Sequence, residues 1–139
     1  MPRRETPFLS DQYYHFYNRG NNRQGVFFER DNYLYFLRGV QKYLCGSMDV
    51  LAYCLMPTHY HLLVQVKPLQ LPQQPRRTQS SEFSPTGTMS KNSEVLAAAS
   101  SAAVSQAMMR LGVSYTKAIN KRFGRVGALF QGQFHLYLR

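Results

Sequence analysis

The spacing of hydrophobic and polar residues predicts a strand and a helix at the start of the chain. Residues 12–20, QYYHFYNRG, are aromatic and extended in character, and the NRGNN that overlaps their end favours a turn. Residues 29–46 place apolar side chains every three or four positions, which is typical of an amphipathic helix. Asp31 stands where an N-cap is needed and Gly46 follows the last apolar position, so we expect the helix to lie between them.

A β-hairpin is predicted next. The runs 48–57, MDVLAYCLMP, and 59–66, HYHLLVQV, have the residue types that favour strands, and Pro57 and Thr58 separate them. From residue 67 to 92 the chain carries four of its seven prolines among Gln, Ser and Thr, without a hydrophobic period. We expect this low-complexity segment to be a flexible connection.

Residues 93–124 are rich in alanine and predict a long helix, with an interruption expected at Gly112. Its apolar positions recur every three or four residues: Leu96, Ala99, Ala103, Ala107, Leu111, Tyr115 and Ala118. The tail from residue 125 is punctuated by glycine and then resembles a strand. The order strand, helix, hairpin, helix, strand predicts an α+β fold, an antiparallel sheet with helices on one face, in a single domain over residues 1–139.

The composition and the net charge of the chain indicate what kind of partner it binds. The chain has 139 residues, 44% of them hydrophobic, which suffices for one core, and 17 Lys and Arg against 7 Asp and Glu give a net charge of +10. No acidic residue follows Glu94, so the last third of the chain is purely cationic. Such a balance favours nucleic acid as the partner. Many small basic proteins bind no polyanion, however, and charge alone favours nucleic acid only modestly.

The cysteines and the N-terminus indicate where the protein works. Cys45 and Cys54 are too few and too far apart for a cysteine-rich zinc site, and we expect both to be buried thiols. The segment MPRRETPFLS lacks the apolar region of a signal peptide, and no apolar run approaches the length of a membrane span. We therefore expect a soluble, cytoplasmic protein that does not enter membranes.

His59 and His61 are the candidate metal ligands. Side chains two residues apart in a strand point to the same face, so the two imidazoles should lie side by side. Imidazole is the commonest metal ligand, and such a pair can supply two positions to a divalent ion. The alternative is a strand whose two histidines are satisfied by hydrogen bonds. Taken alone, the two-histidine motif favours this structural interpretation over metal binding.

Three blocks in this order strengthen the metal hypothesis: YHFYNRGNNRQGVFFERDNYLYFL, AYCLMPTHYHLLVQV and SYTKAINKRFGRVGALFQGQF. Together they resemble the HUH single-tyrosine transposases, of the insertion-sequence-200-like and REP-associated type, over nearly the whole chain outside the connection. The resemblance implies a ferredoxin-like fold. It also implies that His59 and His61, with Tyr60 between them, bind Mg²⁺ or Mn²⁺. The family usually has Asn at the position of Thr58 and commonly Arg at that of Gln133.

In this family the metal polarises the phosphate of single-stranded or hairpin DNA, and a tyrosine attacks it to form a 5′-phosphotyrosine and a free 3′-OH. Family members occur as monomers and as dimers, so a homodimer is possible. Basic and amide side chains of the NRGNNRQ loop and of the cationic third would contact the DNA. We assign this role to Arg19, Asn21, Arg23, Lys121, Arg122 and Arg125.

The resemblance also implies an attacking tyrosine. In the family it lies in a Tyr-x-x-x-Asn or Tyr-x-x-x-Gln pattern on a helix after the LFQG block, and residues 131–139 contain no such pattern. We expect this chain to lack that nucleophile. Tyr115 is the one substitute, but Ile119 occupies the position four residues on, and the helical period puts Tyr115 on the apolar stripe.

Two other functions stay open at this point. One is a nuclease-inactive nucleic-acid-binding protein derived from a transposase. The other is an RNA-binding sheet that uses Tyr13, Phe16 and Tyr17 as a stacking platform, in which case the histidine pair would be accidental. His15 has no assigned role, and we expect His135 on the surface.

Overall fold

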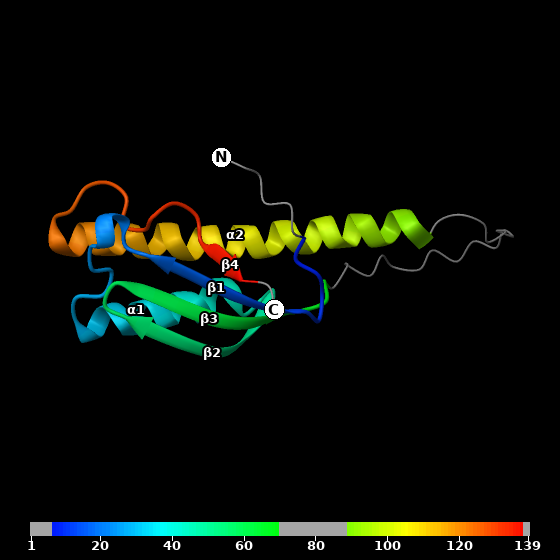
Figure 1. Cartoon of the computed structure of the whole chain (residues 1–139), viewed down its shortest axis with the longest axis horizontal. Coiled ribbons are helices and arrows are strands. Elements are labelled where there is room, and N and C mark those ends of the chain that lie inside the picture. The colour runs from blue at the N-terminus through cyan, green and yellow to red at the C-terminus, as the bar shows by residue number, and fades with distance from the viewer. Residues whose placement is uncertain (1–6, 70–88, 138–139) are drawn as a thin grey trace, which may run out of the picture.

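The computed structural model describes residues 7–69 and 89–137. They form four strands, two α-helices and two short helical turns (Figure 1). In chain order these are β1 (Tyr13–Arg19), the 3₁₀ turn η1 (Asn21–Arg23), α1 (Arg30–Gly39), the π-helical turn η2 (Val40–Leu44), β2 (Met48–Met56), β3 (His59–Val66), α2 (Met89–Phe123) and β4 (His135–Tyr137).

All strand pairs are antiparallel, and the sheet has the order β2-β3-β1-β4. The predicted hairpin is confirmed, with β2 and β3 joined through Pro57 and Thr58. At the centre of the sheet Phe16 of β1 lies between Leu62 of β3 and Leu136 of β4. The α+β fold with an antiparallel sheet is therefore confirmed, and its two central strands are the first strand and the second strand of the hairpin.

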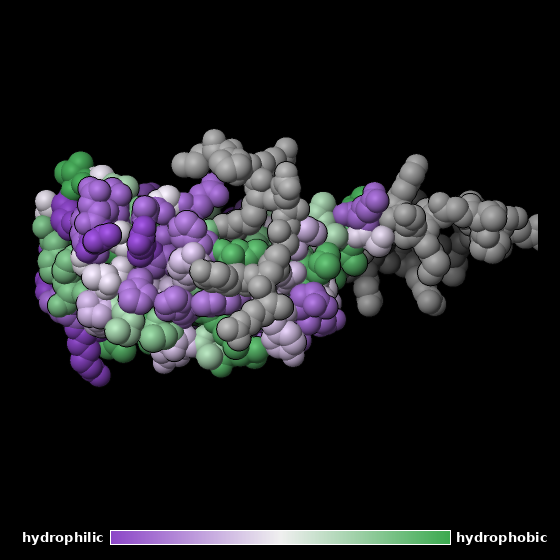
Figure 2. All heavy atoms as spheres, viewed as in Figure 1, coloured by the Kyte–Doolittle hydropathy of each residue, from purple (hydrophilic) through white to green (hydrophobic). Residues whose placement is uncertain are grey.

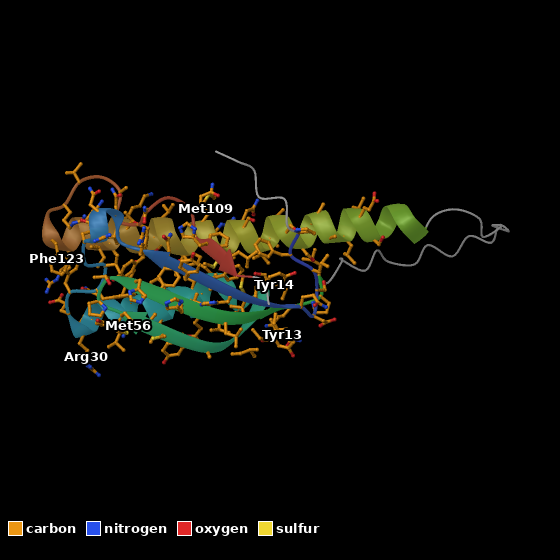
Figure 3. All side chains as sticks on the ribbon, viewed as in Figure 1. Tyr13, Tyr14, Arg30, Met56, Met109 and Phe123 are labelled. Atoms are coloured by element: carbon orange, nitrogen blue, oxygen red, sulfur yellow. The ribbon has the colours of Figure 1, made fainter. Side chains whose placement is uncertain are left out.

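Alternation along β1 separates the two faces of the sheet. Tyr14 and Phe16 point into the core and are 4% and 0% exposed, whereas Tyr13 is 56% exposed on the other side. Figure 3 labels Tyr13 and Tyr14, which leave the strand on opposite sides. We call the side of Tyr14 the inner face and the side of Tyr13 the outer face.

Both helices cover the inner face. Leu62 and Val64 of β3 share one core cluster with Phe36 of α1 and with Leu111 and Tyr115 of α2. Within the described ranges neither helix crosses to the outer face, which stays open. An antiparallel sheet tolerates this arrangement because its second face can meet solvent.

Close approach of the two helices depends on Gly39. A Cβ atom at this position would lie 2.9 Å from Cδ1 of Leu111 on α2. A real Cβ does not approach another carbon so closely, so the glycine lets α1 pack directly on α2. An alanine at residue 39 would therefore require the end of the Leu111 side chain to shift.

The N-terminus of α1 differs from the prediction by two residues. Glu29 is the N-cap, and the side-chain oxygen of Asn32 accepts the backbone N–H groups of Glu29 at 3.0 Å and Phe28 at 2.9 Å. Asp31 lies in the first turn, where its negative charge interacts favourably with the helix dipole. A reciprocal Glu29 and Asn32 pair therefore starts the helix in place of a simple Asp cap.

Helix α2 continues through Gly112 without the expected interruption. Leu111 and Tyr115 are anchored in the core on either side of this glycine, which offsets its poor helix propensity. The buried stripe is also shifted at its start, because Ser100 and Val104 point inward in place of Ala99 and Ala103. Among so many alanines the helical period is weakly marked.

The expectation of buried thiols was wrong. Cys45 follows η2 and Cys54 lies on β2, and both are exposed. Cys54 stands opposite His61, so it belongs to the outer face, which no described helix covers. The predicted connection at 67–92 lies mostly outside the described residues. None of the described helices is long and apolar enough to cross a membrane.

Candidate metal and nucleic-acid site

The pair His59 and His61 lies on the outer face of β3. Tyr60 between them points into the core and is 4% exposed, which fixes its two neighbours on the opposite side. On β1, Arg19 stands directly opposite His59, and Tyr17 stands opposite His61. The sequence prediction that the two histidines share a strand face is confirmed.

All four histidines of the chain gather on this face. The ring centroids of His59 and His61 are 5.2 Å apart, and those of His61 and His15 are 5.0 Å apart. Tyr17 continues the row, since its ring lies 5.8 Å from that of His61 and 5.0 Å from that of His135. Three strands therefore build one continuous surface of imidazole and phenol rings.

Hydrogen bonds engage the same ring nitrogen on both candidate ligands. Nδ1 of His59 is 3.0 Å from Oγ1 of Thr58, and Nδ1 of His61 is 2.8 Å from Nε2 of His15. No hydrogen bond from another described residue reaches either Nε2 atom. The Nε2 atoms are therefore the nitrogens that can act as donors to a metal or a ligand.

The electrostatics of the face favour neutral imidazole at His61. Partial burial lowers the pKa of His61, and the neighbouring His15 and His59 lower it further, because a second positive charge beside them is unfavourable. Neutral imidazole is the form that binds metals. The neighbours of His61 thus reduce competition from protons for its lone pair.

Two histidines fit part of a divalent metal's coordination shell. Within the described ranges, no group of three or more His, Cys, Asp or Glu side chains is arranged to hold an ion. Mg²⁺ and Mn²⁺ commonly keep waters and take phosphate oxygens as further ligands. Two imidazole nitrogens could fill two positions around such an ion, and oxygen atoms of water and of a substrate would have to fill the others.

The end of β1 and the turn after it carry three of the predicted DNA contacts, and one of them, Arg19, stands opposite His59. Arg19, Asn21 and Arg23 come from the end of β1 and from η1, and the backbone N–H of Gly20 donates to the carbonyl of Thr58 at 2.8 Å. Gly20 is required here, because a Cβ would collide with the carbonyl oxygen of residue 24 in the same turn. The glycine of the NRG motif therefore lets the turn close against the start of β3.

Two of the predicted basic contacts have structural partners. Arg122 forms an ion pair with Glu29, with 3.0 Å between Nε and Oε1. Arg125 donates to the side-chain oxygens of Asn120 at 2.9 Å and Gln24 at 2.6 Å, and so ties the end of α2 to η1. Their roles in binding DNA stay predictions, but both side chains also stabilise this end of the fold.

Lys121 and Arg23 are exposed, and neither side chain has an ion pair or hydrogen bond with another described residue. Arg19 is exposed as well, with its Nε donating to Oε1 of Gln131. Figure 2 shows hydrophilic side chains gathered over η1 and the end of α2, at the left of the molecule. This end is also where β3 begins with His59.

The fold is similar to that of a solved DNA transposase. The structure of a REP-associated tyrosine transposase bound to a REP hairpin matches 100% of this chain and 63% of its own chain, with a TM-score of 0.56 and 12% identity. The chain has the REP-associated transposase fold. It spans less than two thirds of the length of that neighbour.

The other comparisons with known proteins give one weaker structural match and no sequence match. A Deinococcus radiodurans R1 protein assigned as a transposase matches 99% of this chain and 86% of its own, with a TM-score of 0.43 and 14% identity. No family model matches the sequence, and no curated protein matches it either.

The transposase fold places Tyr115 away from the histidines. Tyr115 is 1% exposed on the inner face, and its hydroxyl donates to the carbonyl of Val26 at 2.5 Å. Its ring packs against Phe36 at 5.1 Å, and burial raises its pKa well above the usual range for tyrosine. The sheet therefore lies between this hydroxyl and the candidate metal ligands, and the structure does not bring them together.

The remaining sequence candidates fall on both faces. His135 is exposed, as expected, and Tyr13 and Tyr17 lie on the outer face, where bases could stack. Phe16, the third residue of the suggested RNA platform, is 0% exposed in the core. Residue His15, which the sequence left without a role, is the one that joins the histidine pair. No signal in the sequence pointed to this contact, because it follows from the register that pairs residues 13–19 with 59–65.

A hollow of about 600 Å³ lies apart from the histidines, between α2 and the segment before β4. Its walls include Met108, Met109 and Phe130, and the buried Asn18 contributes a polar group. Asn18 is an inner-face residue, so the hollow opens on the side of the sheet opposite the histidines. This hollow is therefore separate from the histidine site.

Proposed function

We propose that this protein binds hairpin or single-stranded DNA and holds a divalent cation, Mg²⁺ or Mn²⁺, between His59 and His61 against a DNA phosphate. The observation that carries the proposal is the open outer face, on which both histidines have Nδ1 engaged and Nε2 available. The transposase fold of the chain supports DNA as the partner, since the solved neighbour is bound to a REP hairpin.

Each group at the site has a distinct task in this proposal. His59 and His61 hold the cation, which when bound would polarise a phosphate oxygen and neutralise its charge. Arg19, opposite His59, provides a positive charge for a neighbouring phosphate. Tyr17, on the outer face, offers a ring on which an unpaired base can stack.

Strand cleavage and rejoining require an attacking tyrosine as well. In the chemistry of HUH transposases a tyrosine oxygen attacks phosphorus, the bond to the 3′ oxygen breaks, and the 3′-OH leaves with a proton while a 5′-phosphotyrosine forms. Tyr115 does not fit this role, because it is buried on the opposite face. The burial of Tyr115 favours the second candidate, a nuclease-inactive DNA-binding protein with the same site.

Metal binding is tested by thermal stabilisation. Mn²⁺ should raise the melting temperature of the wild-type protein, because a ligand of the folded state stabilises it by mass action. Both His59→Ala and His61→Ala should abolish this increase, whereas His135→Ala, on the same face, should keep it. Equal stabilisation of all four proteins would contradict the assignment.

DNA binding is tested by fluorescence anisotropy with a labelled hairpin, the same sequence as a blunt duplex, and a matched RNA hairpin. The DNA hairpin should bind most tightly, and affinity should fall steeply with salt because cationic side chains displace counterions. Preference for the RNA, independent of Mn²⁺ and of His59, would favour an RNA-binding sheet instead. A homodimer and a cytoplasmic location stay predictions.

A further inference from the structure

His15 is in direct contact with one of the two candidate ligands. It lies on β1, diagonally across from His61 on the neighbouring strand, since Tyr17 is the residue directly opposite His61. The two ring centroids are 5.0 Å apart with 30° between the ring planes, and Nε2 of His15 is 2.8 Å from Nδ1 of His61. Two central strands of the sheet hold this contact in place.

A hydrogen bond between two neutral imidazoles requires an N–H on one ring and a lone pair on the other. Which of the two rings donates decides whether Nε2 of His61 can bind a metal. If Nδ1 of His61 donates, its Nε2 carries a lone pair and can bind a metal. If Nε2 of His15 donates instead, His61 holds its own proton on Nε2 and cannot bind through that atom. The His15 contact therefore selects between a binding and a non-binding tautomer.

We propose that His15 is a positioning residue that accepts the Nδ1 proton of His61 and thereby presents Nε2 of His61 to the cation. This inference rests on the proposed function of His59 and His61. Histidine ligands usually donate the N–H of their second nitrogen to an acceptor, most often a carboxylate, a backbone carbonyl or water, which fixes both the tautomer and the ring orientation; here the acceptor would be Nε2 of His15.

The Nδ1 atom of His59 has a less selective partner. The hydroxyl of Thr58 can either donate or accept, so it supports both tautomers of His59. In His15 the accepting nitrogen also requires that the proton reside on its other nitrogen, Nδ1. The stricter constraint therefore falls on His61, the ligand nearer the centre of the sheet.

Two substitutions separate the hydrogen bond from the shape of the side chain. In His15→Gln the amide oxygen stands three bonds from Cβ, as Nε2 of histidine does, and can accept the same proton. In His15→Phe the ring remains but the acceptor is removed. His135→Phe is the matched control, because it makes the same change at another histidine of the outer face.

The experiment measures Mn²⁺ affinity of the full chain by isothermal titration calorimetry. We expect His15→Phe to weaken binding about 10–100-fold, and His15→Gln to stay within about threefold of wild type. Wild-type affinity in His15→Phe would overturn the inference. Equal weakening in both variants would overturn it too, in favour of His15 as a direct ligand. Melting temperatures without metal show that each variant is folded.

A second readout needs no metal. Nitrogen-15 chemical shifts of the imidazoles should show the proton of His61 on Nδ1 in the wild-type protein, and a mixture of tautomers in His15→Phe. A proton on Nε2 in the wild type would overturn the inference. Should His61→Ala bind Mn²⁺ as the wild type does, the proposed function itself fails, which the His15 variants alone would not show.

Discussion

The hydroxyl of Tyr115 offers a quantitative test of whether this residue is structural or catalytic. In Tyr115→Phe the ring stays in the core while the 2.5 Å hydrogen bond to the carbonyl of Val26 is removed. Both residues are at most 1% exposed, so water cannot replace the missing donor. Leaving a buried carbonyl without its partner costs about 1–3 kcal/mol.

For a domain of this length, each kcal/mol shifts the melting temperature by about 4 °C. Tyr115→Phe should therefore lower the melting temperature by roughly 4–12 °C in a calorimetric scan. Tyr13→Phe is the matched control, because Tyr13 is 56% exposed and its substitution should change stability by less than about 0.5 kcal/mol.

Binding provides the other half of the test. Tyr115→Phe should retain the Mn²⁺ response and the DNA affinity of the wild type, since the sheet separates it from the histidines. The reasoning is refuted if the variant melts like the wild type and loses a metal-dependent activity on DNA. That result would make α2 the catalytic helix.

Three further predictions concern the charged surface, alkaline stability and covalent chemistry. The double variant Arg23→Gln/Lys121→Gln should lower the salt slope of DNA binding by about 0.7 for each phosphate that is no longer neutralised, while Lys42→Gln, on η2, should not. The free energy of unfolding should fall as pH rises above about 10, because tyrosines ionise there in the unfolded chain while burial raises the pKa of Tyr60 and Tyr115 in the folded state. Urea titrations between pH 8 and 11 measure this free energy, and a value that does not change with pH contradicts the prediction. With Mn²⁺ and a hairpin, the chain should form no DNA adduct that survives SDS, and an adduct that disappears in Tyr17→Phe would instead identify a nucleophile on the outer face.

The alternation of residues 12–20 and 59–66 was enough to predict the two central strands and the shared face of His59 and His61. A period of two assigns side chains to faces regardless of which strands are neighbours. The helix from residue 29 and the hairpin turn at Pro57 follow equally from local signals.

What the sequence could not provide was register. The contact between His15 and His61 spans 46 positions and exists only because Tyr17 pairs with His61; a slip of one residue would place His15 on the other face. The exposure of Cys54 has a different origin, since a thiol in a strand-like apolar run is expected to be buried until the sheet is known to have one open face. The alanines of α2 obscured the period for another reason, because small apolar residues fit either face of a helix.

The order of the elements along the chain has a consequence for synthesis. The ribosome completes β1, β2 and β3, which carry His15, His59 and His61, before it adds the first residue of α2. At that stage the ladder between β1 and β3 can already form, while Phe16, Leu62 and Val64 still lack the helix that buries them. The nascent chain therefore assembles its histidine contacts on one side of a sheet whose other side has α1 to cover it but still lacks α2, and the apolar side chains that α2 will bury are exposed during this interval.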